Sequence, residues 1–295
     1  MPTTPLRFAL FGNEYQARKS LAIEQVLNSL AKRKAEVIVE RKYLNFLLSH
    51  FHLPIGADKA FDGQDFTADF AVSLGGDGTL LTAASCVAEK QMPIVGINVG
   101  RLGFLADIAP EEFPQIIDEI YAGKVRTERH TAIEIQTEGE PLSGIPYALN
   151  DIALLKRDHA SMISINAAID RMPVASYQAD GLIVSTPTGS TAYNLSNGGP
   201  IMAPDTANLC LTPVAPHSLT LRPIVVSDQS EITLTVESRS HNFLVAIDGR
   251  SEPLSQGTVV KIRKAPFPIL IVKRSGHQYF DTLRTKLMWG ADQRQ

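Results

Sequence analysis

The first part of the chain alternates short apolar runs with segments whose apolar residues recur at helical spacing. Residues 18–30 repeat apolar side chains about one helical turn apart, which predicts an amphipathic helix. Residues 70–74 (FAVSL) are continuously apolar and stop at glycines, as in a strand buried on both faces. The expected strands are 6–11, 36–40, 70–74 and 93–99, and the expected helices are 18–30, 43–48, 80–90 and 111–122. This alternation predicts an α/β domain whose sheet is mostly parallel.

The pattern changes near Thr127, after which short apolar runs alternate with turn residues. Many of these runs are rich in Ile and Val, which predicts an all-β, sandwich-like domain. The expected strands are 132–137, 162–169, 182–185, 231–236, 243–247, 259–263 and 269–272, with a short helix after Ser190 and a helix over 279–289. We therefore expect an α/β domain over 1–127, a β-rich domain over 128–274, and a segment, 275–295, that packs back on the first domain.

The composition of the chain limits the classes of protein to which it can belong. Of the 295 residues 44% are hydrophobic and 20% are charged, which is ordinary for a globular protein of two domains. The net charge of −3, with no Lys/Arg-rich run, argues against nucleic-acid binding. No apolar stretch is long enough to cross a membrane, and the N-terminus lacks the features of a signal peptide. Two cysteines, Cys86 and Cys210, are too few for a disulfide framework, so we expect a cytoplasmic protein.

The first segment that carries chemistry is Gly75-Gly76-Asp77-Gly78-Thr79, between the buried strand and the following helix. Its glycines let backbone N–H groups approach a ligand, and the N-terminus of a helix favours a phosphate. Asp77 would repel a phosphate unless it binds a metal or accepts a proton. The alternative is a plain turn in which Asp77 caps the helix and Gly78 supplies a positive φ. The segment is neither a Walker A loop nor a dinucleotide fingerprint, because the required Gly-Lys-Ser/Thr and third glycine are missing.

A second segment, residues 180–193 (DGLIVSTPTGSTAY), leaves a strand at Ser185 and enters a loop rich in Thr, Ser, Gly and Pro. Such a loop offers hydroxyl and N–H groups, and Tyr193 can stack on a ligand. A self-satisfied Ser/Thr turn is the alternative. The loop 197–200 (NGGP) follows directly, and Asn150-Asp151, after a strand-like run, would on its own be a turn.

In their order along the chain, 75–79 (GGDGT), 150–151 (ND), 186–193 (TPTGSTAY) and 197–200 (NGGP), the four segments resemble the motifs of the NAD kinase family. Residues 96–107 (GINVGRLGFLAD) and 216–223 (PHSLTLRP) are similar to that family as well, and the likeness runs from about Phe70 to Trp289. The GGDGT motif is shared with diacylglycerol-type lipid kinases and approximately with phosphofructokinases. The TPTGSTAY motif is far more selective, and on it the resemblance rests.

The resemblance implies transfer of the γ-phosphoryl group of ATP to the 2′-hydroxyl of the adenosine ribose of NAD, giving NADP. Asp77 would take the proton from that hydroxyl. Mg²⁺ or another divalent cation would be bound mainly through the ATP phosphates, without a metal site on the protein. The implied phosphate loop is Gly75, Gly76, Gly78 and Thr79. The implied NAD-binding residues are Asp77, Gly78, Phe104, Asn150, Asp151, Gln178, Asp180, Thr191, Ala192, Tyr193, Asn194, Leu195, Ser196 and Arg250.

Several questions stay open at this point. Gln178 stands where relatives differ, so the choice between NAD and NADH is undecided, as are the phosphoryl donor and feedback by NADP(H). Arg250 either touches a phosphate or is a solvated turn charge, whereas His217 and Arg222 are expected to hold the second domain together. The family implies a homodimer or homotetramer. Two other functions are considered: a lipid kinase that shares only the GGDGT loop, and a dinucleotide sensor without catalysis.

Overall fold

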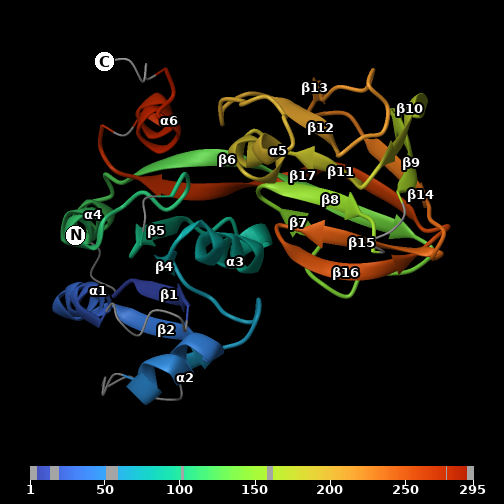
Figure 1. Ribbon diagram of the computed structural model, residues 1–295. Helices are drawn as coiled ribbons and strands as arrows, with labels where there is room; N and C mark the ends of the chain where they lie inside the picture. The colour runs from blue at the N-terminus through green and yellow to red at the C-terminus, as the bar shows by residue number, and fades with distance from the viewer. Residues whose placement is uncertain are drawn as a thin grey trace. The chain divides into compact units, whose positions relative to one another are not determined.

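The computed structural model describes residues 5–13, 20–50, 59–100, 103–157, 162–276 and 278–290 (Figure 1). The chain forms two compact units. The first comprises residues up to Arg129 and those from Ile269 onward, and the second is His130–Pro268. The expected division ended the β-rich domain at residue 274. The second unit ends earlier because the last residues of the strand β17 (Val259–Lys273) pair with β5 (Ile94–Asn98) of the first unit.

A parallel sheet forms the centre of the first unit. Its strands lie in the order β3 (Ala60–Phe61), β2 (Glu36–Glu40), β1 (Arg7–Gly12), β4 (Phe70–Gly75), β5 and the end of β17. Each of these neighbours pairs in parallel, which confirms the expected α/β architecture. Since parallel strands in such a sheet are covered on both faces, their apolar runs are continuous, as FAVSL is.

The helices of this unit are α1 (Ser20–Lys32), α2 (Arg41–His50), α3 (Asp77–Val87), α4 (Phe113–Tyr121) and α6 (Tyr279–Leu287). The expected start of α1 at Arg18 lies outside the described residues. Side chains from α1, α2 and α4 join those of the strands in one core cluster, with Phe8, Val72 and Phe113 fully buried. In the described part of the chain, no helix combines the length and apolar character that a membrane crossing requires.

The second unit contains antiparallel strands in two sheets. One has the order β10 (Met172–Ala179), β9 (Ile163–Ile169), β14 (Ile232–Glu237) and β17, and β6 (Arg126–Glu138) pairs with both β17 and β7 (Tyr147–Ala148). The other runs β13 (Ile224–Ser227), β12 (Asn208–Val214), β11 (Gly181–Ser185), β8 (Asp151–Leu155), β15 (Asn242–Ile247), β16 (Arg250–Ser255). A single apolar cluster with side chains from both sheets confirms the expected all-β domain.

Two details of the expected strands were wrong. Residues 259–263 and 269–272 were expected as two strands, but β17 is continuous through Pro266 and Pro268. In the described chain its pairing with β14 ends at Ile262 and its pairing with β5 begins at Ile271, so Pro266 and Pro268 lie between these two ladders. In addition β8, β10, β12, β13 and β16 were not expected. Of these, β10 and β16 are edge strands with mostly exposed side chains, so their apolar signal is weak.

Candidate active site

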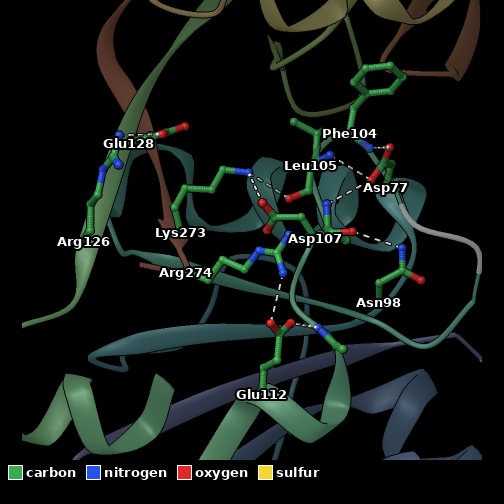
Figure 2. Close-up of polar contacts among 12 residues, drawn as sticks. Asp77, Asn98, Phe104, Leu105, Asp107, Glu112, Arg126, Glu128, Lys273 and Arg274 are labelled. Carbon is green, nitrogen blue, oxygen red and sulfur yellow. Dashed lines mark hydrogen bonds and ion pairs between the residues drawn. The ribbon is translucent and has the colours of Figure 1, made fainter. Parts of the chain in front are cut away.

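Asp77 is the first residue of α3, directly after β4. Its carboxylate does not cap the helix, whose N-cap is Gly76, and Gly78 does not have a positive φ. Instead it accepts three hydrogen bonds from a neighbouring loop (Figure 2). The N–H of Phe104 donates to Oδ2 at 2.8 Å, and those of Leu105 and Ala106 donate to Oδ1 at 3.1 and 3.0 Å. The alternative of a plain turn is therefore wrong, because the carboxylate is fixed by a distant segment.

Glycines make this arrangement possible. A Cβ at Gly103 would lie 1.9 Å from Oδ1 of Asp77, and one at Gly75 would lie 2.1 Å from Oγ1 of Thr79. A Cβ at Gly76 or Gly78 would instead meet nothing within 4 Å. The first two glycines thus permit close packing, whereas the other two face open space beside Asp77. Of the similar segment 96–107, Arg101 and Leu102 lie outside the described residues.

Asp77 is half-buried, and its two oxygens are used unequally. Oδ1 accepts two of these three hydrogen bonds and Oδ2 accepts one. A carboxylate oxygen can accept about two hydrogen bonds, so Oδ2 retains the capacity for one more. A hydroxyl group that approached Oδ2 would meet an acceptor of fixed orientation.

In the second unit, the loop after β11 is held by its own polar groups. The Ser190 hydroxyl donates to the Pro187 carbonyl at 2.6 Å and accepts the Met202 N–H at 2.9 Å. The Asn194 amide donates to the carbonyls of Ser190 and Pro200 and accepts the Thr212 hydroxyl at 2.5 Å. Asn194 is fully buried, so its side chain supports the loop from within.

The other residues implied in this loop are accessible. Thr191, Ala192 and Leu195 are half-buried, and Ser196 is exposed. Tyr193 is 39% exposed, which is unusual for a large aromatic side chain and leaves its ring free to contact a ligand. The loop therefore offers the side chains around Tyr193, rather than Asn194, to its surroundings.

Asn150-Asp151 lies directly against this loop. The Thr186 N–H donates to the Asn150 carbonyl at 2.9 Å, and the Thr186 hydroxyl donates to the Leu149 carbonyl at 2.6 Å. A Cβ at Gly189 would lie 2.1 Å from the Asn150 carbonyl oxygen, so only glycine fits there. Two segments that are far apart in the sequence are thus brought together.

Asp248 holds the same pair from the other side. With Gly249 it forms a two-residue turn between β15 and β16 in which both residues have positive φ, as a type I′ turn requires. Its carboxylate accepts the N–H groups of Leu149, Asn150 and Asp151 at 2.7, 2.8 and 3.1 Å. Asp248 was not among the expected site residues, although the Asp-Gly dipeptide is the recognised signal for this turn.

The polar groups of Asn150 and Asp151 are buried. Among the described residues Oδ1 of Asn150 has no hydrogen-bond partner, so it is available to accept a hydrogen bond from a ligand. Burial, together with the neighbouring Asp248 carboxylate, raises the pKa of Asp151 to about 7. Burial likewise raises the pKa of Asp248, against the effect of its three N–H donors.

The side chains of four other implied residues have different surroundings. Gln178 is on β10, where it donates to Ser164 Oγ at 2.9 Å and lines a recess of about 530 Å³. Asp180 forms an ion pair with Lys156 at 2.7 Å. Arg250 is exposed and donates to the carbonyls of Tyr147 and Ile247, which favours a structural role. Phe104 is half-buried, and Lys286 of α6 lies 5.9 Å from its ring centroid.

The pKa of Asp151 predicts a pH-dependent effect of Asp151→Asn on stability. The folded state holds this proton more firmly than the unfolded state, whose ordinary value is 3.8. This contribution to stability is full below about pH 4 and is lost as the pH rises to about 7. We therefore expect the melting temperature of Asp151→Asn, relative to the unsubstituted protein, to rise between pH 5 and pH 8. Thermal unfolding of both proteins at the two pH values measures this difference. Exposed Asp205→Asn is the control, and an equal difference at both pH values would contradict the assignment.

Two family models match this chain. The ATP-NAD kinase N-terminal domain matches residues 9–125, and the ATP-NAD kinase C-terminal domain matches residues 149–274. The chain is 53% identical over 289 residues to an NAD kinase of Bacteroides fragilis, a match that covers 98% of this chain and 100% of that protein. It is 38% identical over 285 residues to an NAD kinase of Porphyromonas gingivalis, covering 97% and 98%.

Solved structures agree with this relationship. The fold matches yeast NADH kinase complexed with NADH at a TM-score of 0.87 and 24% identity, covering 98% of this chain and 90% of that one. It matches an NAD kinase from Archaeoglobus fulgidus in complex with ATP at 0.72 and 27%, covering 96% and 99%. Since both family models and full-length relatives agree, the chain belongs to the ATP-NAD kinase family.

Proposed function

We propose that this chain transfers the γ-phosphoryl group of ATP to the 2′-hydroxyl of the adenosine ribose of NAD, giving NADP. One observation carries the proposal beyond family membership. The Asp77 carboxylate is fixed by three N–H groups, and its Oδ2 can accept one more hydrogen bond. An alcohol that attacks phosphorus must lose its proton, and a base in fixed position typically accelerates such a step by roughly 10²–10⁴-fold. Asp77 is therefore proposed as the base for the 2′-hydroxyl.

The proposed phosphate loop is Gly75, Gly76, Gly78 and Thr79, at the N-terminus of α3. The partial positive charge of a helix N-terminus favours phosphate oxygens. The open space beside Gly76 and Gly78 lets a bulky anion approach the backbone, because no side chain occupies it. These features support a triphosphate at this end of the helix.

The proposed NAD site in the second unit consists of Asn150, Asp151 and the accessible residues Thr191, Ala192, Tyr193, Leu195 and Ser196. Its support is that the Asn150 Oδ1 has no hydrogen-bond partner among the described residues and that the Tyr193 side chain is exposed. Asn194 would contribute by holding the loop, since its side chain is fully buried. Gly78, Phe104, Gln178, Asp180 and Arg250 stay predicted contacts.

A divalent cation that is bound mainly by ATP is compatible with the side chains of the described residues. Among the described residues, no three His, Cys, Asp or Glu side chains are grouped to hold a metal ion. Magnesium is commonly held through one or two carboxylates and the substrate phosphates, so the ATP oxygens would be its main ligands. The ion would neutralise charge on the phosphates during transfer.

We further propose a cytoplasmic homodimer or homotetramer. Both cysteines are buried and neither forms a disulfide bond within the described chain, which suits a reducing compartment. The edge strands β10 and β13 expose apolar side chains, among them Met172 at 67% and Val225 at 45%. Exposed apolar edges of this kind favour pairing with another chain. The two other functions are not favoured, because a lipid kinase would share only the GGDGT loop and a sensor needs no fixed carboxylate.

A coupled assay tests the reaction. The purified protein is given ATP, Mg²⁺ and NAD, and NADP is detected with an NADP-specific dehydrogenase. We expect NADP only when all three are present. Binding of NAD without NADP formation would support the sensor, and phosphorylation of diacylglycerol would support the lipid kinase. Replacing ATP by other triphosphates or polyphosphate, and NAD by NADH, determines donor and acceptor preference.

We expect Asp77→Asn to lower kcat by about 10²-fold or more while the Kd for NAD changes little. The amide cannot take up the proton, and its NH₂ group cannot accept the Phe104 N–H bond. Steady-state kinetics and NAD titration measure the two effects. Asp205→Asn serves as the control at an exposed position, and near-normal turnover of the Asp77 variant would show that Asp77 is not the base.

We expect Tyr193→Ala to raise the Kd for NAD by about tenfold or more, since an aromatic contact and its buried area would be lost. Tyr193→Phe separates the ring from the hydroxyl, and it should retain most of the affinity if stacking dominates. Isothermal titration with NAD measures both variants. An unchanged Kd in the alanine variant would remove Tyr193 from the site.

A further inference from the structure

Lys273 is a buried cation next to the candidate active site. It is the last residue of β17, and its side chain is only 2% exposed. Its ammonium group lies 3.1 Å from Oδ2 of Asp107, whose side chain is also 2% exposed, and 3.4 Å from the Leu105 carbonyl (Figure 2). Lysine is rarely buried to this extent, so the pair requires an explanation.

Asp107 belongs to the segment that fixes Asp77. In residues 104–106 the N–H groups donate to Asp77, whereas carbonyl groups of the same residues point to other partners. The Leu105 carbonyl contacts Lys273, and the Ala106 carbonyl accepts the amide of buried Asn98 at 3.0 Å. Figure 2 shows Asp77 on one side of this segment and Lys273 on the other. Lys273 therefore contacts one side of the 104–106 backbone, and the N–H groups on the other side of that backbone hold Asp77.

Stability alone does not account for the pair. Two buried charges lose their hydration, and replacing such a pair by well-packed apolar residues of similar volume is often neutral or stabilising. The neighbouring residues Ile271 and Val272 are fully buried and already join β17 to β5. A charged pair also fixes the orientation of the 104–107 segment, because Lys273 contacts a defined carboxylate and a defined carbonyl of that segment.

We propose that Lys273, through its pair with Asp107, is a positioning residue for Asp77. It holds the 104–106 backbone so that the three N–H groups keep Oδ2 of Asp77 turned toward the reacting hydroxyl. This inference rests on the proposed role of Asp77 as base. Lys273 itself touches neither substrate.

The test uses the full-length protein with the single variant Lys273→Met and the double variant Lys273→Met/Asp107→Leu. The double variant replaces the pair by apolar side chains and avoids an unpaired buried carboxylate, so it should fold. We expect kcat of both to fall about tenfold or more, because small misplacements of a reacting group are costly. The Kd for NAD should change less than about threefold, since no proposed NAD contact in the second unit is altered.

Arg274→Met is the matched control, since the adjacent Arg274 forms an exposed ion pair with Glu112 at 3.1 Å, and its kcat should be unaffected. Adding Lys273→Met to Asp77→Asn should cause little further loss, because both changes act through one carboxylate. A double variant with a normal melting temperature and normal kcat would overturn the proposal, as would full additivity with Asp77→Asn. If Asp77→Asn is itself fully active, Asp77 is not the base. This result differs from those that would overturn the role of Lys273, so the two hypotheses can be told apart.

Discussion

The hydrogen bonds from residues 104–106 to the Asp77 carboxylate join the two segments on which the first unit's chemistry depends. They are possible because β4 and β5 are parallel neighbours in the sheet, so the segments that leave their carboxyl ends emerge at the same edge. The turn after β4 supplies the carboxylate, and the segment after β5 supplies the donors. Any change in the pairing of these strands would separate base and donors, although neither lies in a strand. The sheet is thus the scaffold for a contact between two loops.

The second unit contains the same kind of interaction, a carboxylate that accepts three backbone N–H groups. There the carboxylate holds the backbone, whereas in the first unit the backbone holds the carboxylate. Asp248 accepts three consecutive N–H groups, from residues 149–151, as Asp77 does from residues 104–106. In the first case the accepting carboxylate is the proposed reacting group, and the backbone holds it. In the second case the carboxylate sits in a turn, and the backbone that it holds carries Asn150 and Asp151 toward the loop. Hydrogen bonds to an ionised group are stronger than neutral ones, which makes aspartate suited to both tasks.

The sequence predicts the architecture well where burial is continuous or periodic, as in FAVSL of β4 or in the run that becomes β15. It fails where the environment decides, as in β17, which continues through two prolines that lie between its ladders with β14 and β5. The GGDGT segment can be singled out by its residue types, whereas Asn150-Asp151 is singled out only by the family resemblance, and the turn at Asp248 is indicated by its Asp-Gly dipeptide. Lys273 could not be singled out, since a lysine after PILIV is equally typical of a strand that leaves the core for solvent. Its burial depends on Asp107, which is 166 residues away in the chain.

The polar loop after β11 illustrates why motif residues and contact residues need not coincide. Ser185, Thr186, Ser190 and Asn194 are fully buried, and each forms a hydrogen bond with a neighbouring segment or within the loop. Buried His130 adds a bond of 2.9 Å to Thr188. A satisfied polar network of this kind fixes a loop more strictly than apolar packing would, because each lost bond leaves a desolvated group. Most hydroxyl and amide groups of the motif therefore act on the loop, which leaves groups such as Tyr193 and the Asn150 Oδ1 as the proposed contacts to the dinucleotide. Rigid loops with a few available groups bind with little loss of conformational entropy, and this requirement explains a motif so rich in small polar residues.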